Sequence, residues 1–112
     1  MLAYKHRLRR EEDIKEVLRT GTRVYTPVAA FTVRKTTPIE SARVCVITGK
    51  KVHTSAVVRH RVQRLLRAVA QDVVAEKATG YDMVMVAQAP AVKIRAKADF
   101  EELYRLILKH VS

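Results

Sequence analysis

The sequence predicts a small α+β fold, a single domain over residues 1–112 in which helices pack on a four-stranded mixed sheet. Three observations favour this class. The chain of 112 residues has the length of one domain. Hydrophobic residues make up 48%, which is enough for a packed core. The spacing of apolar residues alternates between helical and strand periods, in the order helix, three strands, helix, strand, helix.

The first element is predicted to be a helix over residues 10–20. Ile14, Val17 and Leu18 follow the spacing i, i+3, i+4 and give that helix one apolar stripe. Gly21 is the residue at which we expect it to end.

Three strands are expected next. Residues 22–26 form a short one, which Pro27 restricts to a sheet edge or a bend. Residues 29–34 alternate between two faces, as a half-buried strand does. Residues 44–47 are apolar on both faces, which favours a central strand.

Residues 55–77 are predicted to form a long helix, because apolar residues recur at i, i+4, i+7, i+8, i+11 and i+15 from Val58. Either Thr54 or Ser55 suits its N-cap.

A strand and a helix close the predicted fold. The strand at 82–87 can pair with that at 43–48 through the long helix as a βαβ unit, for which a right-handed crossover is the general rule. The last helix is expected to open at Asp99, with Glu102 completing a capping box.

The charge balance indicates a polyanionic partner. Lys and Arg number 22 against 11 Asp and Glu, a formal net charge of +11. A folded body with this excess repels itself unless a polyanion compensates it, with nucleic acid first, an acidic membrane second and an acidic protein third. A single cysteine, Cys45, excludes an intramolecular disulfide framework and fits a cytoplasmic location.

The positive charge is concentrated on the long helix. Residues 41–71 contain no Asp or Glu. At about 100° per residue, His60, Arg64 and Arg67 lie opposite the apolar arc, with Arg59 and Arg61 on its flanks. The alternative is a solvated helix face, but such faces usually mix both signs, and arginine adds bidentate phosphate binding.

A second basic group lies near the start of the chain, at Lys5, Arg7, Arg9 and Arg10. A solvated chain terminus explains these charges as well as a role in binding does.

No sequence motif of metal-dependent or nucleophilic catalysis is found. His53 and His60, beside two lysines, leave open a metal-independent ribonuclease with histidines as acid and base. Cys45 lies in an apolar strand and is better explained as a small buried residue than as a nucleophile.

Residues 50–67 resemble the signature of the bacterial ribonuclease P protein subunit, which has two lysines, a short loop, and a helix that opens with Ala-Val and carries Arg-Asn-Arg and further basic residues. Residues 7–21 and 81–90 resemble the family's first helix and last strand, so the resemblance covers nearly the whole chain. The residues that match the signature are Lys50, Lys51, Ala56, Val57, Arg59, Arg61, Arg64 and Arg67, and His60 occupies the position of the central Asn.

The resemblance implies a fold similar to certain ribosomal protein domains, with a left-handed βαβ crossover in place of the usual hand. It also implies that a catalytic RNA subunit, using Mg²⁺, removes the 5′ leader of precursor tRNA. The protein would bind that RNA and hold the leader in a cleft between the sheet face and the central helix. No cofactor, metal site or catalytic residue is then expected in the protein, and neither DNA nor a membrane as partner.

Site residues carry over by resemblance. The RNA subunit is expected to contact Lys50, Lys51, Arg59, His60, Arg61, Arg64 and Arg67, and the leader Arg9, Arg10, Phe31 and Arg34. Several positions depart from the family pattern: His60 stands for Asn, Gly49 for Ser, Cys45 for Gly, and Ile14 and Leu18 for the Phe residues common in the first helix. We expect those last two replacements to shift leader binding from base stacking towards backbone charge. The alternative function is that of another RNA-binding protein of this fold, a ribosomal component or RNA chaperone.

Overall fold

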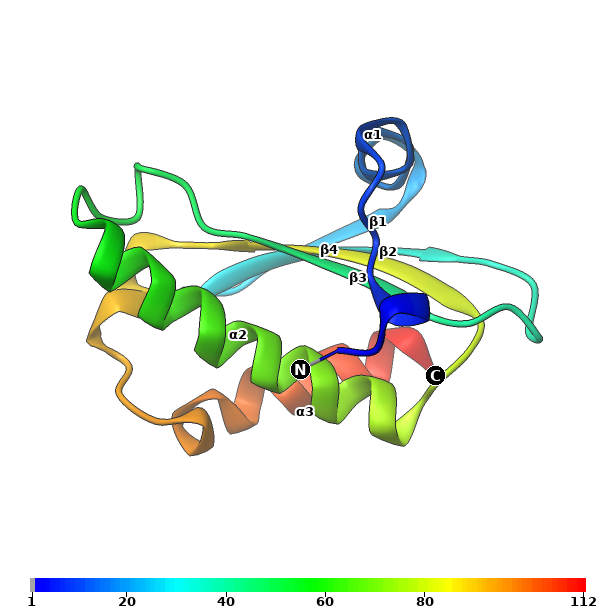
Figure 1. Ribbon diagram of the computed structural model, residues 1–112. Helices are drawn as coiled ribbons and strands as arrows, with labels where there is room; N and C mark the ends of the chain where they lie inside the picture. Colours follow the sequence, from blue (N-terminus) through cyan, green and yellow to red (C-terminus); the bar gives the residue numbers. More distant parts are fainter. Residues whose placement is uncertain (1) are drawn as a thin grey trace.

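The computed structural model describes residues 2–112 and has three layers, with α1 on one face of the sheet and α2 and α3 on the other (Figure 1). The predicted order of elements is confirmed, with short 3₁₀ turns added before α1 and after β4. The elements are η1 (Tyr4–His6), α1 (Glu11–Thr20), β1 (Thr22–Tyr25), β2 (Ala29–Lys35), β3 (Arg43–Ile47), α2 (Ala56–Glu76), β4 (Tyr81–Ala87), η2 (Ala89–Lys93), η3 (Lys97–Phe100) and α3 (Glu101–Val111).

The four strands form one mixed sheet in the order β1-β2-β4-β3. β1 pairs with β2, and β2 with β4, in antiparallel fashion, whereas β3 and β4 are parallel and connected through α2. This parallel pair is the predicted βαβ unit. The left-handed sense of its crossover stays an expectation from the resemblance.

The prediction that residues 44–47 form a central strand is wrong, because β3 is an edge strand and β4 lies between it and β2. β3 is apolar on both faces since each face is covered. Val44 and Val46 belong to the main core with α2, while Cys45 packs against the smaller cluster beneath α1. The outer edge of β3 is partly covered by the N-terminal segment, where the backbone N–H of Leu8 donates to the carbonyl oxygen of Val44 at 3.0 Å.

Two apolar clusters hold the layers together. The larger fills the space between the sheet and the helices α2 and α3, and includes Phe31, Leu66 and Ile107. The smaller lies on the opposite face, where Leu8 and Val17 pack on Val84. α2 thereby buries one side completely and exposes the other, which is the side that carries its positive charge.

Of the two capping predictions, the one for α2 is confirmed and the one for α3 is wrong. Ser55 is confirmed as the N-cap of α2, since its hydroxyl accepts from the backbone N–H of Val58 at 3.4 Å. The predicted cap at Asp99 is wrong. α3 begins two residues later, after Phe100 has entered the core, and the carboxylate of Asp99 instead accepts from the N–H of Ala96 within η3. Burial of the Phe100 ring requires the preceding turn and overrides the local capping signal.

Within residues 2–112, none of the helices has the length and apolar character needed to cross a membrane.

Candidate nucleic-acid interface

A hollow of about 850 Å³ runs along the outer edge of β3, between the N-terminal segment and the exposed side of α2. Its floor is made by Val44, Cys45 and Val46, and none of its lining residues is acidic. The polar lining consists of Arg7, Arg9, His60, Gln63, Arg64, Arg67 and Gln71. An apolar floor with cationic walls offers both contact area and phosphate neutralisation to a nucleic-acid strand.

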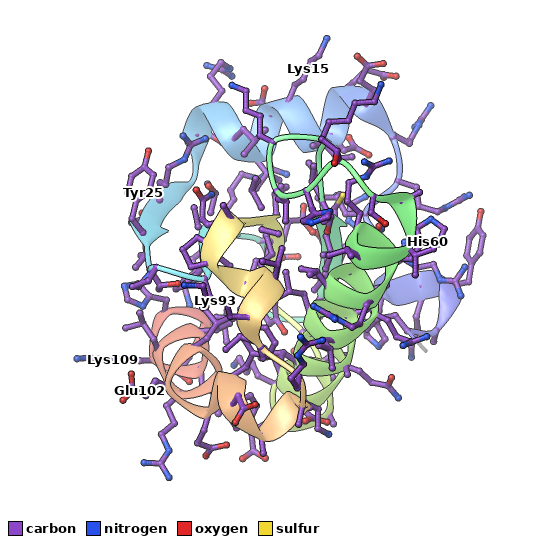
Figure 2. All side chains as sticks on the ribbon, turned by 90° about the vertical axis from the view of Figure 1, so that its left-hand side faces the viewer. Lys15, Tyr25, His60, Lys93, Glu102 and Lys109 are labelled. Carbon is purple, nitrogen blue, oxygen red and sulfur yellow. The ribbon has the colours of Figure 1, made fainter. Side chains whose placement is uncertain are left out.

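The wall that α2 contributes is the cationic row, which we define as His60, Arg64 and Arg67. The three residues are exposed and, spaced i, i+4 and i+7, share one side of the helix, with His60 pointing outward (Figure 2). No carboxylate among the described residues forms an ion pair with any of them. The exposed basic side of α2 that the sequence predicts is therefore present, and no carboxylate of the described residues neutralises it.

Arg59 and Arg61 lie on the two flanks of the row, as predicted, but both bind the protein's own backbone. Nη1 of Arg59 donates to the carbonyl oxygens of His53 and Thr54 at 3.0 and 2.9 Å. Nη2 of Arg61 donates to the carbonyl oxygen of Val92 in η2. A neutral carbonyl orients a guanidinium without neutralising it, so both remain cations, half-buried and fixed in direction.

Lys50 and Lys51 lie apart from the cationic row, in the exposed turn between β3 and α2. They border a second, smaller hollow of about 490 Å³ between that turn and residues 86–89. The predicted contacts to the RNA subunit thus form three groups around the N-terminal half of α2.

The residues predicted to contact the leader do not all lie on the surface. The prediction that Phe31 contacts the leader is wrong, because its side chain is 0% exposed and its ring packs edge-on against His110 of α3 inside the core. The strand register turns it towards α3, so it offers no surface to a nucleic acid. Arg9 lines the hollow, and Arg10 is exposed at the start of α1.

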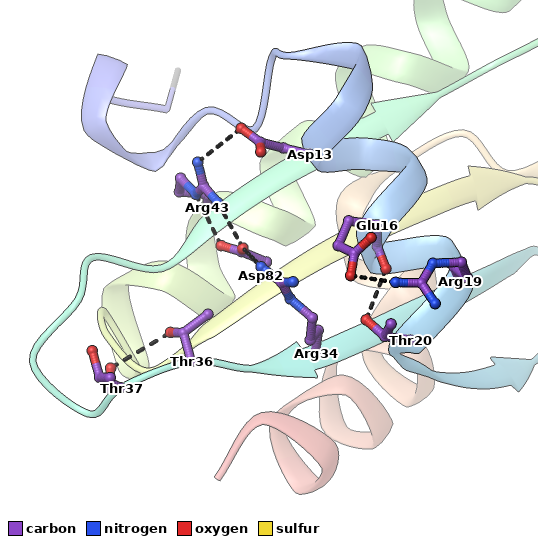
Figure 3. Close-up of polar contacts among 9 residues, drawn as sticks. All are labelled: Asp13, Glu16, Arg19, Thr20, Arg34, Thr36, Thr37, Arg43 and Asp82. Carbon is purple, nitrogen blue, oxygen red and sulfur yellow. Dashed lines mark hydrogen bonds and ion pairs between the residues drawn. The ribbon is translucent and has the colours of Figure 1, made fainter.

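Arg34, the fourth of these residues, belongs to an ion network on the α1 side of the sheet (Figure 3). At its centre Asp82 is 1% exposed and receives Arg43 at 3.0 and 2.7 Å and Arg34 at 3.3 Å. Arg43 also reaches Asp13 of α1 at 3.4 Å. The hydrogen bonds to Asp82 raise the pKa of the Arg43 guanidinium. Arg43 stands in the acid-free part of the sequence, yet carboxylates from β4 and α1 neutralise it.

The structure does not bring the two candidate catalytic histidines into one hollow. His60 lines the large hollow and His53 does not. Nδ1 of His53 accepts from the backbone N–H of Ser55 at 2.9 Å, a local contact before α2. Among residues 2–112 no group of three His, Cys, Asp or Glu side chains is placed to hold a metal ion.

Three polar residues that line the hollow, Arg7, Gln63 and Gln71, are not among the predicted site residues, although Arg7 belongs to the second basic group for which the sequence analysis left a binding role open. Gln63 follows His60 by three positions and Arg7 precedes Arg9 by two, so each shares a side with a predicted residue, and both line the hollow. Helical spacing could have identified Gln63, and also Gln71, which follows Arg67 by four positions. Arg7 could not be identified in this way, because its position depends on the N-terminal segment pairing with β3.

Comparison with known proteins gives consistent matches. The model of the Ribonuclease P family matches residues 2–111. The ribonuclease P protein component of Kocuria rhizophila is 34% identical over 105 residues, covering 94% of this chain and 88% of the relative. That of Microcystis aeruginosa is 28% identical over 107 residues, covering 93% and 89%.

Solved structures agree on the fold. The RNase P protein from Thermotoga maritima superimposes with a TM-score of 0.76 at 18% identity, covering 92% of this chain and 96% of the other. The protein from Staphylococcus aureus gives 0.71 at 20% identity, covering 95% and 91%. Because the family model spans nearly the whole chain and the relatives align along most of their own length, the chain belongs to the family of ribonuclease P protein components.

Proposed function

We propose that this protein is the RNA-binding subunit of a bacterial ribonuclease P, which binds the catalytic RNA and the 5′ leader of precursor tRNA and assists removal of that leader in the cytoplasm. The observation that carries the proposal is the cationic row beside an acid-free hollow, in a member of this family. The unpaired charges of Arg64 and Arg67 supply the attraction, His60 adds a hydrogen-bonding ring beside them, and the apolar floor of the hollow supplies contact area.

The proposed division of labour is the one that the family resemblance implies. Hydrolysis is assigned to the RNA subunit, where Mg²⁺ would supply the activation of water and the charge stabilisation that the reaction needs. The protein's side chains bind the RNA subunit and orient the leader of precursor tRNA. Arg64 and Arg67 neutralise phosphates and release counterions, and the flanking Arg59 and Arg61 present guanidiniums held in fixed directions. Each phosphate contact adds affinity that weakens as salt rises.

The test is reconstitution. Labelled precursor tRNA is incubated with the protein, with the RNA subunit and with both, at low magnesium. We expect cleavage at the 5′ end of the mature tRNA only when the RNA is present, and faster with both components than with RNA alone. Cleavage by the protein alone would indicate an independent ribonuclease. Binding without stimulation would indicate another RNA-binding role, such as a ribosomal component or RNA chaperone.

A further inference from the structure

Few aromatic side chains are available to stack on a nucleobase. Of the six aromatic residues, Tyr4 and Tyr25 are exposed, at 67% and 72%. Phe31, Tyr81 and Phe100 are buried and Tyr104 is half-buried. Any stacking of a tyrosine or phenylalanine ring on RNA in this protein must therefore come mainly from Tyr4 or Tyr25.

Tyr4 lies beside the hollow and is already paired with one of its walls. The guanidinium carbon of Arg9, a lining residue, lies 4.2 Å from the centre of the Tyr4 ring, and its Nη2 donates to the Tyr4 hydroxyl. Arg9 covers one face of the ring. Since the side chain still exposes two-thirds of its surface, the opposite face is open to solvent.

The segment that carries Tyr4 is fixed on both sides of the ring. Nδ1 of the buried His6 donates to the carbonyl oxygen of Ala42 at 2.6 Å, and Nε of Arg7 donates to that of Leu2 at 3.0 Å. The N–H of Leu8 pairs with Val44 of β3. The ring is held on a short 3₁₀ turn that packs on the sheet edge, so little conformational entropy remains to be lost when a base stacks on it.

We propose that Tyr4 and Arg9 form a stacking site for one unpaired nucleotide of the 5′ leader at the mouth of the hollow. The base lies on the open face of Tyr4, and the guanidinium of Arg9 supports the other face and attracts the adjacent phosphate. This site rests on the proposed function of the hollow. It supplies stacking surface from η1 in a chain whose helix α1 carries no aromatic residue.

Tyr25 provides a matched control within the same molecule. It is equally exposed and also has an arginine over its ring, with Arg23 at 5.9 Å from the centroid. It lies on β1, the edge strand opposite β3, and its arginine, Arg23, does not line the hollow, whereas Arg9 beside Tyr4 does. Removing either ring costs a similar amount of exposed aromatic surface, but only Tyr4 is placed to meet the leader.

The experiment measures the affinity of the reconstituted holoenzyme for precursor tRNA and for mature tRNA, which lacks the leader. We expect Tyr4→Ala to weaken precursor binding on the order of 10-fold and to leave mature tRNA unchanged. Tyr4→Phe keeps most of the affinity, and Tyr25→Ala has no effect. A leader with one abasic position at the stacked nucleotide should lose as much with the wild type, and lose nothing further with Tyr4→Ala.

The outcomes separate this site from the proposed function. If the wild-type protein adds affinity for the leader and Tyr4→Ala retains all of it, the stacking site is wrong and the function stands. If Tyr4→Ala weakens mature and precursor tRNA equally, the ring does not contact the leader. If the wild-type protein adds no leader-dependent affinity to the RNA subunit, the proposed function fails and the site fails with it.

Discussion

Two groups of arginines lie within the same small fold and have opposite surroundings. Arg34 and Arg43 converge on Asp82, which is 1% exposed, and Asp13 adds a second carboxylate. Arg64 and Arg67, on the cationic row, face a hollow with no acidic lining residue. The first group is neutralised inside the protein, and the second is left to be neutralised by something else.

The contrast shows that the environment of an arginine, rather than the number of arginines, indicates its role. The network around Asp82 joins β2, β3, β4 and α1, so it stabilises the sheet and the position of the first helix. The cationic row contributes repulsion in the free protein and becomes favourable when phosphates approach. Mutations in the two groups should therefore separate stability from RNA affinity.

The largest expected effect on stability is that of Asp82→Asn. Loss of the central carboxylate leaves Arg34 without its counter-charge and Arg43 with only the longer pair to Asp13, which should lower the free energy of unfolding by about 2–4 kcal/mol. This is less than the full cost for a buried pair because Arg34 and Arg43 remain 32% and 35% exposed. Urea denaturation measures it. The control is Asp72→Asn, which breaks the exposed pair with Lys97 and should cost under about 1 kcal/mol.

Arg61→Ala should give a smaller loss of stability. The substitution removes the donor to the carbonyl oxygen of Val92 and uncovers part of the contact between α2 and η2, at about 1–2 kcal/mol. Arg105→Ala, which removes an exposed pair with Glu101, is the control and should change stability little. Equal stability of the two variants, measured by thermal unfolding, would show that Arg61 does not anchor η2.

The smallest effect is a chemical one, at the floor of the hollow. Burial raises the pKa of the Cys45 thiol, and nearby Arg67 lowers it by a smaller amount. The thiol therefore stays protonated at neutral pH, and alkylation by iodoacetamide should be slow and should accelerate only at a higher pH than alkylation of an exposed cysteine does. Bound RNA subunit should slow it several-fold at fixed pH. In the variant Arg64→Ala/Arg67→Ala, bound RNA should protect the Cys45 thiol to the same extent when the same fraction of protein is bound. If RNA binding leaves the alkylation rate unchanged, the RNA does not lie over the hollow.

The sequence predicted the cationic row because helical spacing alone determines which residues share a side of α2. It could not predict the network around Asp82, which depends on register: Asp82 on β4 lies directly opposite Arg34 of β2 and Arg43 of β3. The same register turns Phe31 into the core. Local periodicity identifies the faces of an element, but the partner of each face is set by tertiary pairing.

The central claim is that the cationic row binds RNA through phosphate contacts that the neutralised arginines do not make. The direct measurement is the salt dependence of binding to the RNA subunit for Arg64→Ala/Arg67→Ala. The matched control is Lys15→Ala/Arg19→Ala, which removes the same charge from α1 residues paired with Glu11 and Glu16. We predict that the slope of log K against log salt concentration falls by about 1.4–1.8 in the first variant, at 0.7–0.9 per contact, and is unchanged in the control. Equal slopes in the two variants would contradict the claim and leave net charge alone as the source of affinity.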